Sequence, residues 1–108
     1  MDNVDFNLLS EDDKTSAKNQ MGVHLPTLRK ALNFTQKDLA DQIGVTRQTL
    51  AGYESGKSKL SWTATVALLT VFIFSDKTLV LLFPLGILNE SIFKALPGLK
   101  IYLSQKQV

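Results

Sequence analysis

The spacing of small, apolar and capping residues from Thr35 to Tyr53 constrains this chain more than any other feature. Thr35 precedes one helical pattern with Asp38 three residues later, a variant of the capping box that starts helices. Gly44 ends that pattern, because glycine adopts the positive φ of a tight turn without steric penalty, and Thr46 can cap the next helix. The apolar positions that would share a core are Leu39, Ile43, Val45, Leu50 and Tyr53. The pattern predicts two short helices, at 36–43 and 47–54, that pack across a tight turn, with Ala40 at the close crossing.

The rest of the chain also reads as helical. Start and stop signals predict four further helices at about 25–32, 62–74, 77–83 and 90–96. Asn33 closes the first of these with a left-handed residue, and Ser61, Asp76 and Asn89 are the expected caps of the others. Apolar and polar residues alternate from Leu99 to Leu103, which allows a short strand. The fold class expected is therefore all-α.

Two short helices joined by a glycine-containing turn form a helix-turn-helix. The residues that surround this one resemble the phage-repressor-like (lambda repressor and Cro, or XRE) helix-turn-helix family over about residues 28–83. The resemblance is carried by Leu28-Arg29, 35–40, 44–50 and 53–57. It implies a five-helix, lambda-repressor-like DNA-binding domain whose third helix enters the major groove of double-stranded DNA. A C-terminal extension with a short helix, and with the strand that the alternation allows, would follow this domain.

The amino end of the helix at 47–54 is the expected reader of bases. Arg47 and Gln48 lie there, where such proteins reach base edges, and they should project outward from the fold. Arginine pairs with guanine through two hydrogen bonds and glutamine does so with adenine. Many members of the family carry glutamine at the position of Arg47, so this chain should read different bases. Thr49 and Ala51 are weaker candidates, for contact with thymine methyl groups or phosphates.

Gly52 stands inside the same helix, where glycine costs about 1 kcal/mol relative to alanine. Glycine marks a close approach of the backbone to something. Either the bare backbone lets the helix lie close to DNA, or the position faces a tightly packed neighbour within the protein. The sequence leaves both interpretations open.

Contacts with the DNA backbone are expected on both sides of the reading helix. Gln36 begins the preceding helix, and the resemblance implies that its amide holds a phosphate. Thr46, Lys57, Ser58 and Lys59 flank the reading helix and would add phosphate contacts that do not depend on sequence. The resemblance also implies a structural pair between Arg29 and Glu54, which would position the helix without reading bases.

The charge is distributed in favour of this interpretation. Residues 1–20 hold two lysines against five acidic residues, whereas residues 21–60 hold six basic residues against three acidic ones. A polyanionic partner favours positive charge at the motif. We expect residues 1–20 to form a flexible arm, 21–88 the DNA-binding domain and 89–108 an extension used for dimerisation. Docking of the arm on a partner is an alternative.

Composition excludes several classes of function. The absence of cysteine removes disulfides and thiolate metal sites, and the single His24 rules out a histidine-rich one. No nucleophile and base can be combined from these residues, so we expect neither an enzyme nor a cofactor. The apolar run 66–74 is too short for a membrane span, which needs about 20 residues. No signal peptide is visible, and a cytoplasmic location is expected.

The apolar residues after residue 65 exceed what a five-helix domain can bury, which predicts a protein interface. A homodimer would present two reading helices about 34 Å apart to a palindromic operator. The function expected is a transcription regulator, specifically a repressor. The alternatives are an antitoxin that binds its own promoter and a toxin protein, and an interaction module that has lost DNA binding.

Overall fold

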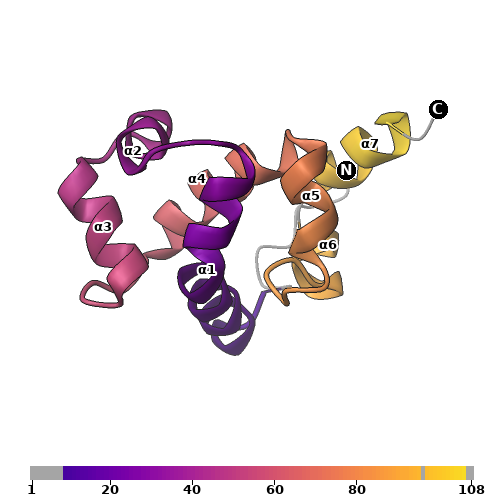
Figure 1. The fold of residues 1–108 in the computed structure, drawn as a ribbon. Coiled ribbons are helices and arrows are strands. Elements are labelled where there is room, and N and C mark those ends of the chain that lie inside the picture. The colour runs from indigo at the N-terminus through magenta and orange to yellow at the C-terminus, as the bar shows by residue number, and fades with distance from the viewer. Residues whose placement is uncertain (1–8, 96, 107–108) are drawn as a thin grey trace.

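The computed structural model of the protein describes residues 9–95 and 97–106, and this part of the chain contains helices and no strand (Figure 1). The all-α prediction is confirmed. The helices are α1 (Glu11–Ala31), α2 (Gln36–Ile43), α3 (Arg47–Ser55), α4 (Trp62–Ile73), α5 (Asp76–Leu82), α6 (Glu90–Ala95) and α7 (Pro97–Lys106). Within the same residues, no helix is long and apolar enough to cross a membrane.

Helix α1 is much longer than predicted. Its 21 residues begin with a capping box, in which the Ser10 side chain accepts from the Asp13 N–H and the Asp13 side chain accepts from the Ser10 N–H. The arm expected at 1–20 is therefore wrong for residues 11–20, and residues 1–8 lie outside the described residues. Pro26, which a helix start at about residue 25 would place in the first turn, lies inside the helix. The helix extends so far because an apolar stripe that includes Ala17 and Met21 is buried in the core.

The turn between α2 and α3 has the geometry that the sequence predicted. The Thr35 side chain accepts from the Asp38 N–H, and the Thr46 side chain accepts from the Thr49 N–H, so each threonine caps its helix. Gly44 ends α2 with a φ of 78°, and Asn33 has a φ of 59° after α1. Left-handed residues at both positions let the chain reverse direction within a few residues.

Helix α4 lies at the centre of the fold and contacts α1, α2 and α5. Its residues Leu68, Leu69 and Phe72 are fully or almost fully buried. The buried Thr65 hydroxyl donates to the Ser61 carbonyl at 2.9 Å, so this polar group does not weaken the core. One core thus joins α4 to the long α1 and to the helix-turn-helix.

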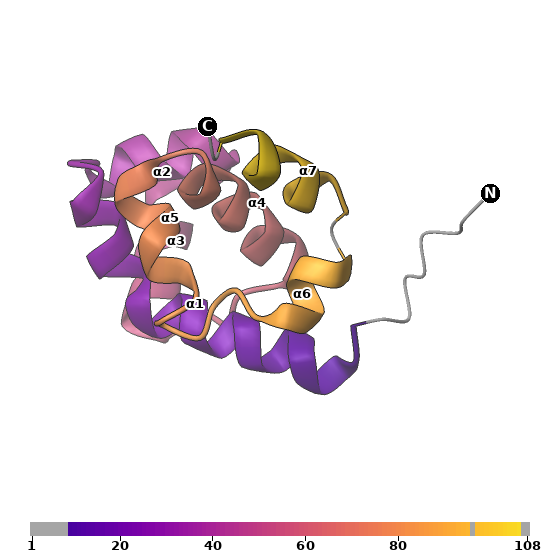
Figure 2. The same cartoon turned by 90° about the vertical axis from the view of Figure 1, so that its right-hand side faces the viewer.

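The C-terminal part differs from the sequence prediction in two places. Residues 99–103, where the alternation allowed a strand, belong to helix α7. A strand needs a partner to pair with, and the described residues hold none, whereas the Tyr102 ring packs edge-on against Phe74 with centroids 5.0 Å apart. Helix α5 starts one residue earlier than expected, after Ser75. Figure 2 shows α7 lying beside α4, and residues of both helices line one pocket.

Candidate nucleic-acid interface

Helix α3 lies at one edge of the molecule, far from α5 and α7 (Figure 1). It packs against α1 and α2 and buries Leu50 completely. Arg47 and Gln48, one residue and two residues after the cap, are both exposed. The fold therefore holds the helix from behind and leaves the two expected base-reading side chains open to solvent.

The structure brings Arg29 and Glu54 together in an ion pair. Arg29 Nε donates to Glu54 Oε2 at 2.7 Å and Nη2 donates to Oε1 at 3.2 Å. The exposed fractions of the two side chains are 12% and 7%, and Arg29 Nη1 also donates to the Phe34 carbonyl at 2.9 Å. Two parallel hydrogen bonds between charged groups fix geometry as well as adding energy. The pair therefore locks the end of α3 onto α1 and onto the loop before α2.

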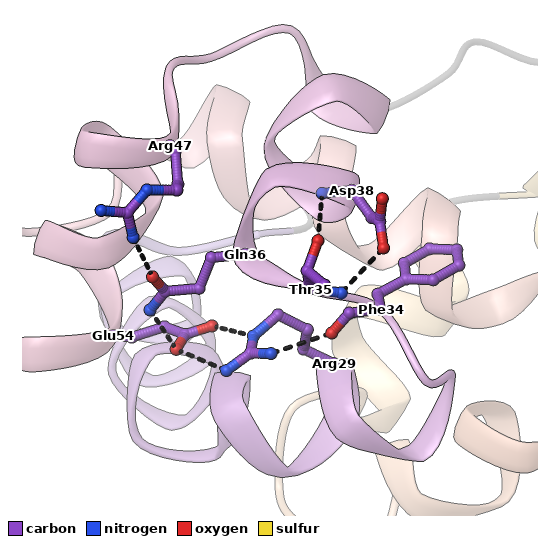
Figure 3. Close-up of polar contacts among 7 residues, drawn as sticks. All are labelled: Arg29, Phe34, Thr35, Gln36, Asp38, Arg47 and Glu54. Atoms are coloured by element: carbon purple, nitrogen blue, oxygen red, sulfur yellow. Dashed lines mark hydrogen bonds and ion pairs between the residues drawn. The ribbon is translucent and has the colours of Figure 1, made fainter.

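Gln36 links this pair to the candidate reader. Its Nε2 donates to Glu54 Oε1 at 3.0 Å, and its Oε1 accepts from Arg47 Nη1 at 2.8 Å. Figure 3 shows Gln36 lying between the side chains of Glu54 and Arg47. The sequence predicted a phosphate contact for this glutamine and did not foresee its contacts within the protein. Four residues, Arg29, Glu54, Gln36 and Arg47, thus form one continuous chain of hydrogen bonds, which we call the polar chain.

Two other expected base-reading residues are less exposed to solvent than Arg47 and Gln48. Thr49 is half-buried, and its hydroxyl lies 2.9 Å from the Thr46 hydroxyl. Ala51 is also half-buried. Thr46, which was expected at a phosphate, is exposed and caps α3. Its hydroxyl therefore already accepts a hydrogen bond within the protein, from the Thr49 N–H.

Gly52 has a packing neighbour within the protein. A Cβ atom at this position would lie 2.9 Å from Ser58 Oγ and 3.4 Å from Ser58 Cβ. The Ser58 N–H also donates to the Gly52 carbonyl at 3.1 Å. These contacts support the interpretation that Gly52 accommodates a neighbour, and they leave its closeness to DNA as a separate proposal.

The segment after α3 carries the expected basic residues. Gly56 ends the helix with a φ of 81°, which turns the chain sharply into Lys57, Ser58 and Lys59. All three side chains are exposed. The segment lies next to the carboxyl end of α3, while Arg47 marks the amino end, so cationic groups lie at both ends of the helix.

The first turn of α2 holds a shifted carboxylate. The Thr35 N–H donates to Asp38 Oδ2 at 2.9 Å. This backbone hydrogen bond, followed by the one between the two side chains, lowers the pKa of Asp38 below its usual value of 3.8. In the same helix the Lys37 ammonium lies 2.8 Å from Asp41, which raises the pKa of the lysine. Lys37 therefore forms an ion pair with Asp41 at the surface.

No group of three or more metal-ligating side chains occurs in the part of the chain that the structure describes. An exposed polar end of α3, a rigid turn behind it and a basic segment beyond it define a helix-turn-helix suited to bind DNA. The helix-turn-helix family model matches residues 27–62, a third of the chain, and confirms the resemblance to the phage-repressor-like family for this segment. No curated protein and no solved structure gives a significant match. The family match indicates a DNA-binding regulator of transcription.

Proposed function

We propose that the protein binds double-stranded DNA sequence-specifically and represses transcription, as a homodimer on a palindromic operator. The observation that carries this proposal is the exposure of Arg47 and Gln48 at the amino end of α3, while the other face of that helix is buried. A regulator of this kind acts in the cytoplasm, on DNA that it reaches directly, and it needs no cofactor.

In this proposal α3 enters the major groove and its first turn reads the bases. Arg47 pairs with guanine and Gln48 with adenine, each through two hydrogen bonds. Thr49, Ala51 and Gly52 lie close enough along the helix to touch thymine methyl groups or the sugar–phosphate edge. Because Gln36 already holds one Nη of Arg47, the guanidinium is partly oriented before DNA arrives.

Phosphate contacts would fix the helix in the groove. Gln36 and Thr46 lie on one side of it, and Lys57, Ser58 and Lys59 lie on the other. Such contacts position a protein on the duplex without carrying sequence information. The Gln36 amide has a second hydrogen beyond the one given to Glu54, and this hydrogen is the one we assign to a phosphate oxygen.

Dimerisation is supported by apolar side chains that the fold does not bury. Val80 and Phe83 of α5 are 67% and 49% exposed, and Phe74 and Ile101 are also exposed. These four belong to the last third of the chain, which begins with the carboxyl end of α4. We assign this region, from α5 through the C-terminus, to the contact between two copies. Two α3 helices about 34 Å apart would match successive turns of DNA.

The test is a pair of substitutions measured on an operator selected from a random DNA pool. Arg47→Ala should weaken the selected operator by about 1–3 kcal/mol and relax the base preference at one position. Lys57→Ala should weaken all sequences alike and reduce the salt slope by about one unit. Equal losses for both variants on every sequence would show that α3 does not read bases.

An antitoxin is the second candidate, favoured by the same exposed apolar side chains, which could cover a toxin protein instead of a second copy. Copurification of a small protein with the chain, expressed from its own locus, would decide in its favour. A pure interaction module without DNA binding is opposed by the exposed Arg47 and Gln48. A salt-dependent mobility shift with DNA would exclude it.

A further inference from the structure

A groove of about 640 Å³ separates the amino-terminal half of α1 from the segment that follows α3. One wall carries Thr15, Lys18 and Asn19 of α1, and the other carries Ser55, Ser58 and Lys59. The second wall overlaps the basic segment already assigned to phosphates. The first wall belongs to the residues that the sequence analysis placed in an arm, and no role has been given to it.

The α1 wall is a single helical face. Thr15, Lys18, Asn19, Gly22 and Val23 follow at the spacing of three and four residues that aligns side chains along one side of a helix. At Gly22 the two walls meet, because a Cβ atom there would lie 3.7 Å from Leu60 Cδ1. The groove is therefore closed at Gly22 by packing. Toward the amino end of α1 it is bordered by the hydroxyl, ammonium and amide groups of Thr15, Lys18 and Asn19.

The groove has an excess of positive charge. Neither Lys18 nor Lys59 takes part in an ion pair with any residue that the structure describes. The carboxylate that lines the groove, Glu54, is neutralised by Arg29 at 2.7 Å. The acidic first turn of α1, Glu11 to Asp13, lies two to four residues before Thr15, and none of its side chains lines the groove.

We propose that this groove holds a further stretch of DNA phosphate backbone, next to the one contacted by Lys57, Ser58 and Lys59. Lys18 would pair with a phosphate, and Thr15 and Asn19 would donate hydrogen bonds to neighbouring phosphate oxygens. Lysine, threonine, serine and asparagine are residues that make such contacts in protein–DNA complexes. The proposal rests on the proposed function and lengthens its footprint on the operator beyond the bases that α3 reads.

DNA backbone fits the groove better than a free anion for two reasons. The groove continues from the basic segment after α3, so one strand can pass from the first set of contacts to the second. Its polar groups are also spread over more than one turn of α1, from Thr15 to Asn19, whereas a single small anion needs donors that converge on one point.

The test uses the full chain and the variant Lys18→Gln, with Lys30→Gln as the control. Lys30 is exposed on the same helix and does not line the groove, so the control loses one positive charge without touching the proposed contact. Binding is measured on a long duplex with flanks around the selected operator and on a duplex trimmed to the base pairs that α3 reads. On the long duplex Lys18→Gln should bind about threefold to tenfold more weakly, with a salt slope smaller by about one unit.

On the trimmed duplex Lys18→Gln and the unchanged protein should bind equally, and Lys18→Arg should restore the affinity for the long duplex. Lys30→Gln should match the unchanged protein on both duplexes. A Lys18→Gln protein that binds the long duplex normally, or that loses the same affinity on both lengths, would overturn the second phosphate contact. In either case, a loss of DNA affinity in Lys57→Ala would still support the proposed function. Absence of any specific DNA binding would overturn the function itself.

Discussion

At the scale of single residues, the polar chain explains how a surface side chain can be held before its ligand arrives. Arg29 and Glu54 are mostly buried. Gln36 hydrogen bonds to both Glu54 and Arg47, so it couples the position of the exposed arginine to that of the buried pair. A solvent-exposed arginine otherwise samples many rotamers, and ordering it on binding costs about 0.5–1.5 kcal/mol. Part of that ordering is already done in the free protein.

The ion pair can be tested by removing one partner or both. Glu54→Ala leaves the Arg29 charge buried without a counter-ion, and we expect it to lower the free energy of unfolding by about 3–5 kcal/mol. Replacing both, as Arg29→Met with Glu54→Leu, should cost clearly less than either single change, since no charge is stranded. Denaturant unfolding of the single and double variants measures the coupling. Additive costs would contradict the pair's assigned role.

Gly52 and Ser58 allow the two interpretations of the glycine to be separated. Alanine should gain about 1 kcal/mol of helix stability over glycine, but in the unchanged protein its Cβ meets Ser58 Oγ at 2.9 Å. Gly52→Ala should therefore stabilise the fold more in a Ser58→Ala background than alone. Denaturant unfolding of the four proteins tests this, and equal effects in both backgrounds would contradict it. If the double variant also binds DNA more weakly than Ser58→Ala alone, Gly52 serves close approach to DNA as well.

At the scale of elements, the cap of α2 depends on pH. Because hydrogen bonds from Thr35 lower the pKa of Asp38 below 3.8, its carboxylate stabilises the fold above that pH. This contribution is lost as the pH falls through the lowered pKa. The unfolding temperature of the unchanged protein should therefore exceed that of Asp38→Asn at about pH 6, and the difference should shrink toward about pH 2. A difference that stays constant over this range would show that the charged form is not the one that caps α2.

The helices around the turn could be predicted because their signals are local. Threonine caps and a glycine stop lie within three residues of the ends that they set, and α2 begins and ends at the predicted residues. The same type of signal was present at Ser10 and Asp13 and would have placed the start of α1. Pro26 obscured it, because proline favours the first turn of a helix and suggested a start where the helix in fact continues.

The site could be predicted only in part. The exposure of Arg47 and Gln48 could be predicted, because the apolar Leu39 of α2 and Leu50 of α3 mark the sides of these helices that are buried. The contacts of Gln36 with Glu54 could not be foreseen, because 18 residues separate them and their distance depends on the angle at which α2 and α3 cross. The groove beside Lys18 depends in the same way on where α1 passes the end of α3.

At the scale of the whole molecule, the proposed DNA-binding helix α3 lies at the opposite end from α5, the helix that carries the exposed Val80 (Figure 1). Helix α3 occupies one end, whereas α5, α6 and α7 occupy the other. Helix α1 contacts α3, α4 and α5 and so joins the two ends. This separation suits a molecule that binds DNA with one end and a second copy with the other.

The dimer proposal can be tested on α5. Val80 and Phe83 are exposed, and replacing both with serine removes apolar surface that the fold does not use internally. We expect the double variant to sediment as a monomer at concentrations where the unchanged protein is a dimer, with little change in its unfolding temperature. Its affinity for a palindromic operator should fall, while its affinity for a half-site should not. A monomeric unchanged protein at high micromolar concentration would contradict the proposal.

The 21-residue length of α1 decides how much of this chain must be kept when the proposed DNA-binding helix α3 is moved into another protein. The matched stretch 27–62 starts after Ala17, Met21 and Leu25, which belong to the same buried core cluster as Leu39 and Leu50. A graft cut at those borders would remove part of this core cluster and leave some of its apolar surface facing water. A transplantable unit therefore has to begin at Ser10, so that the helix arrives with its own cap, and to run through α4.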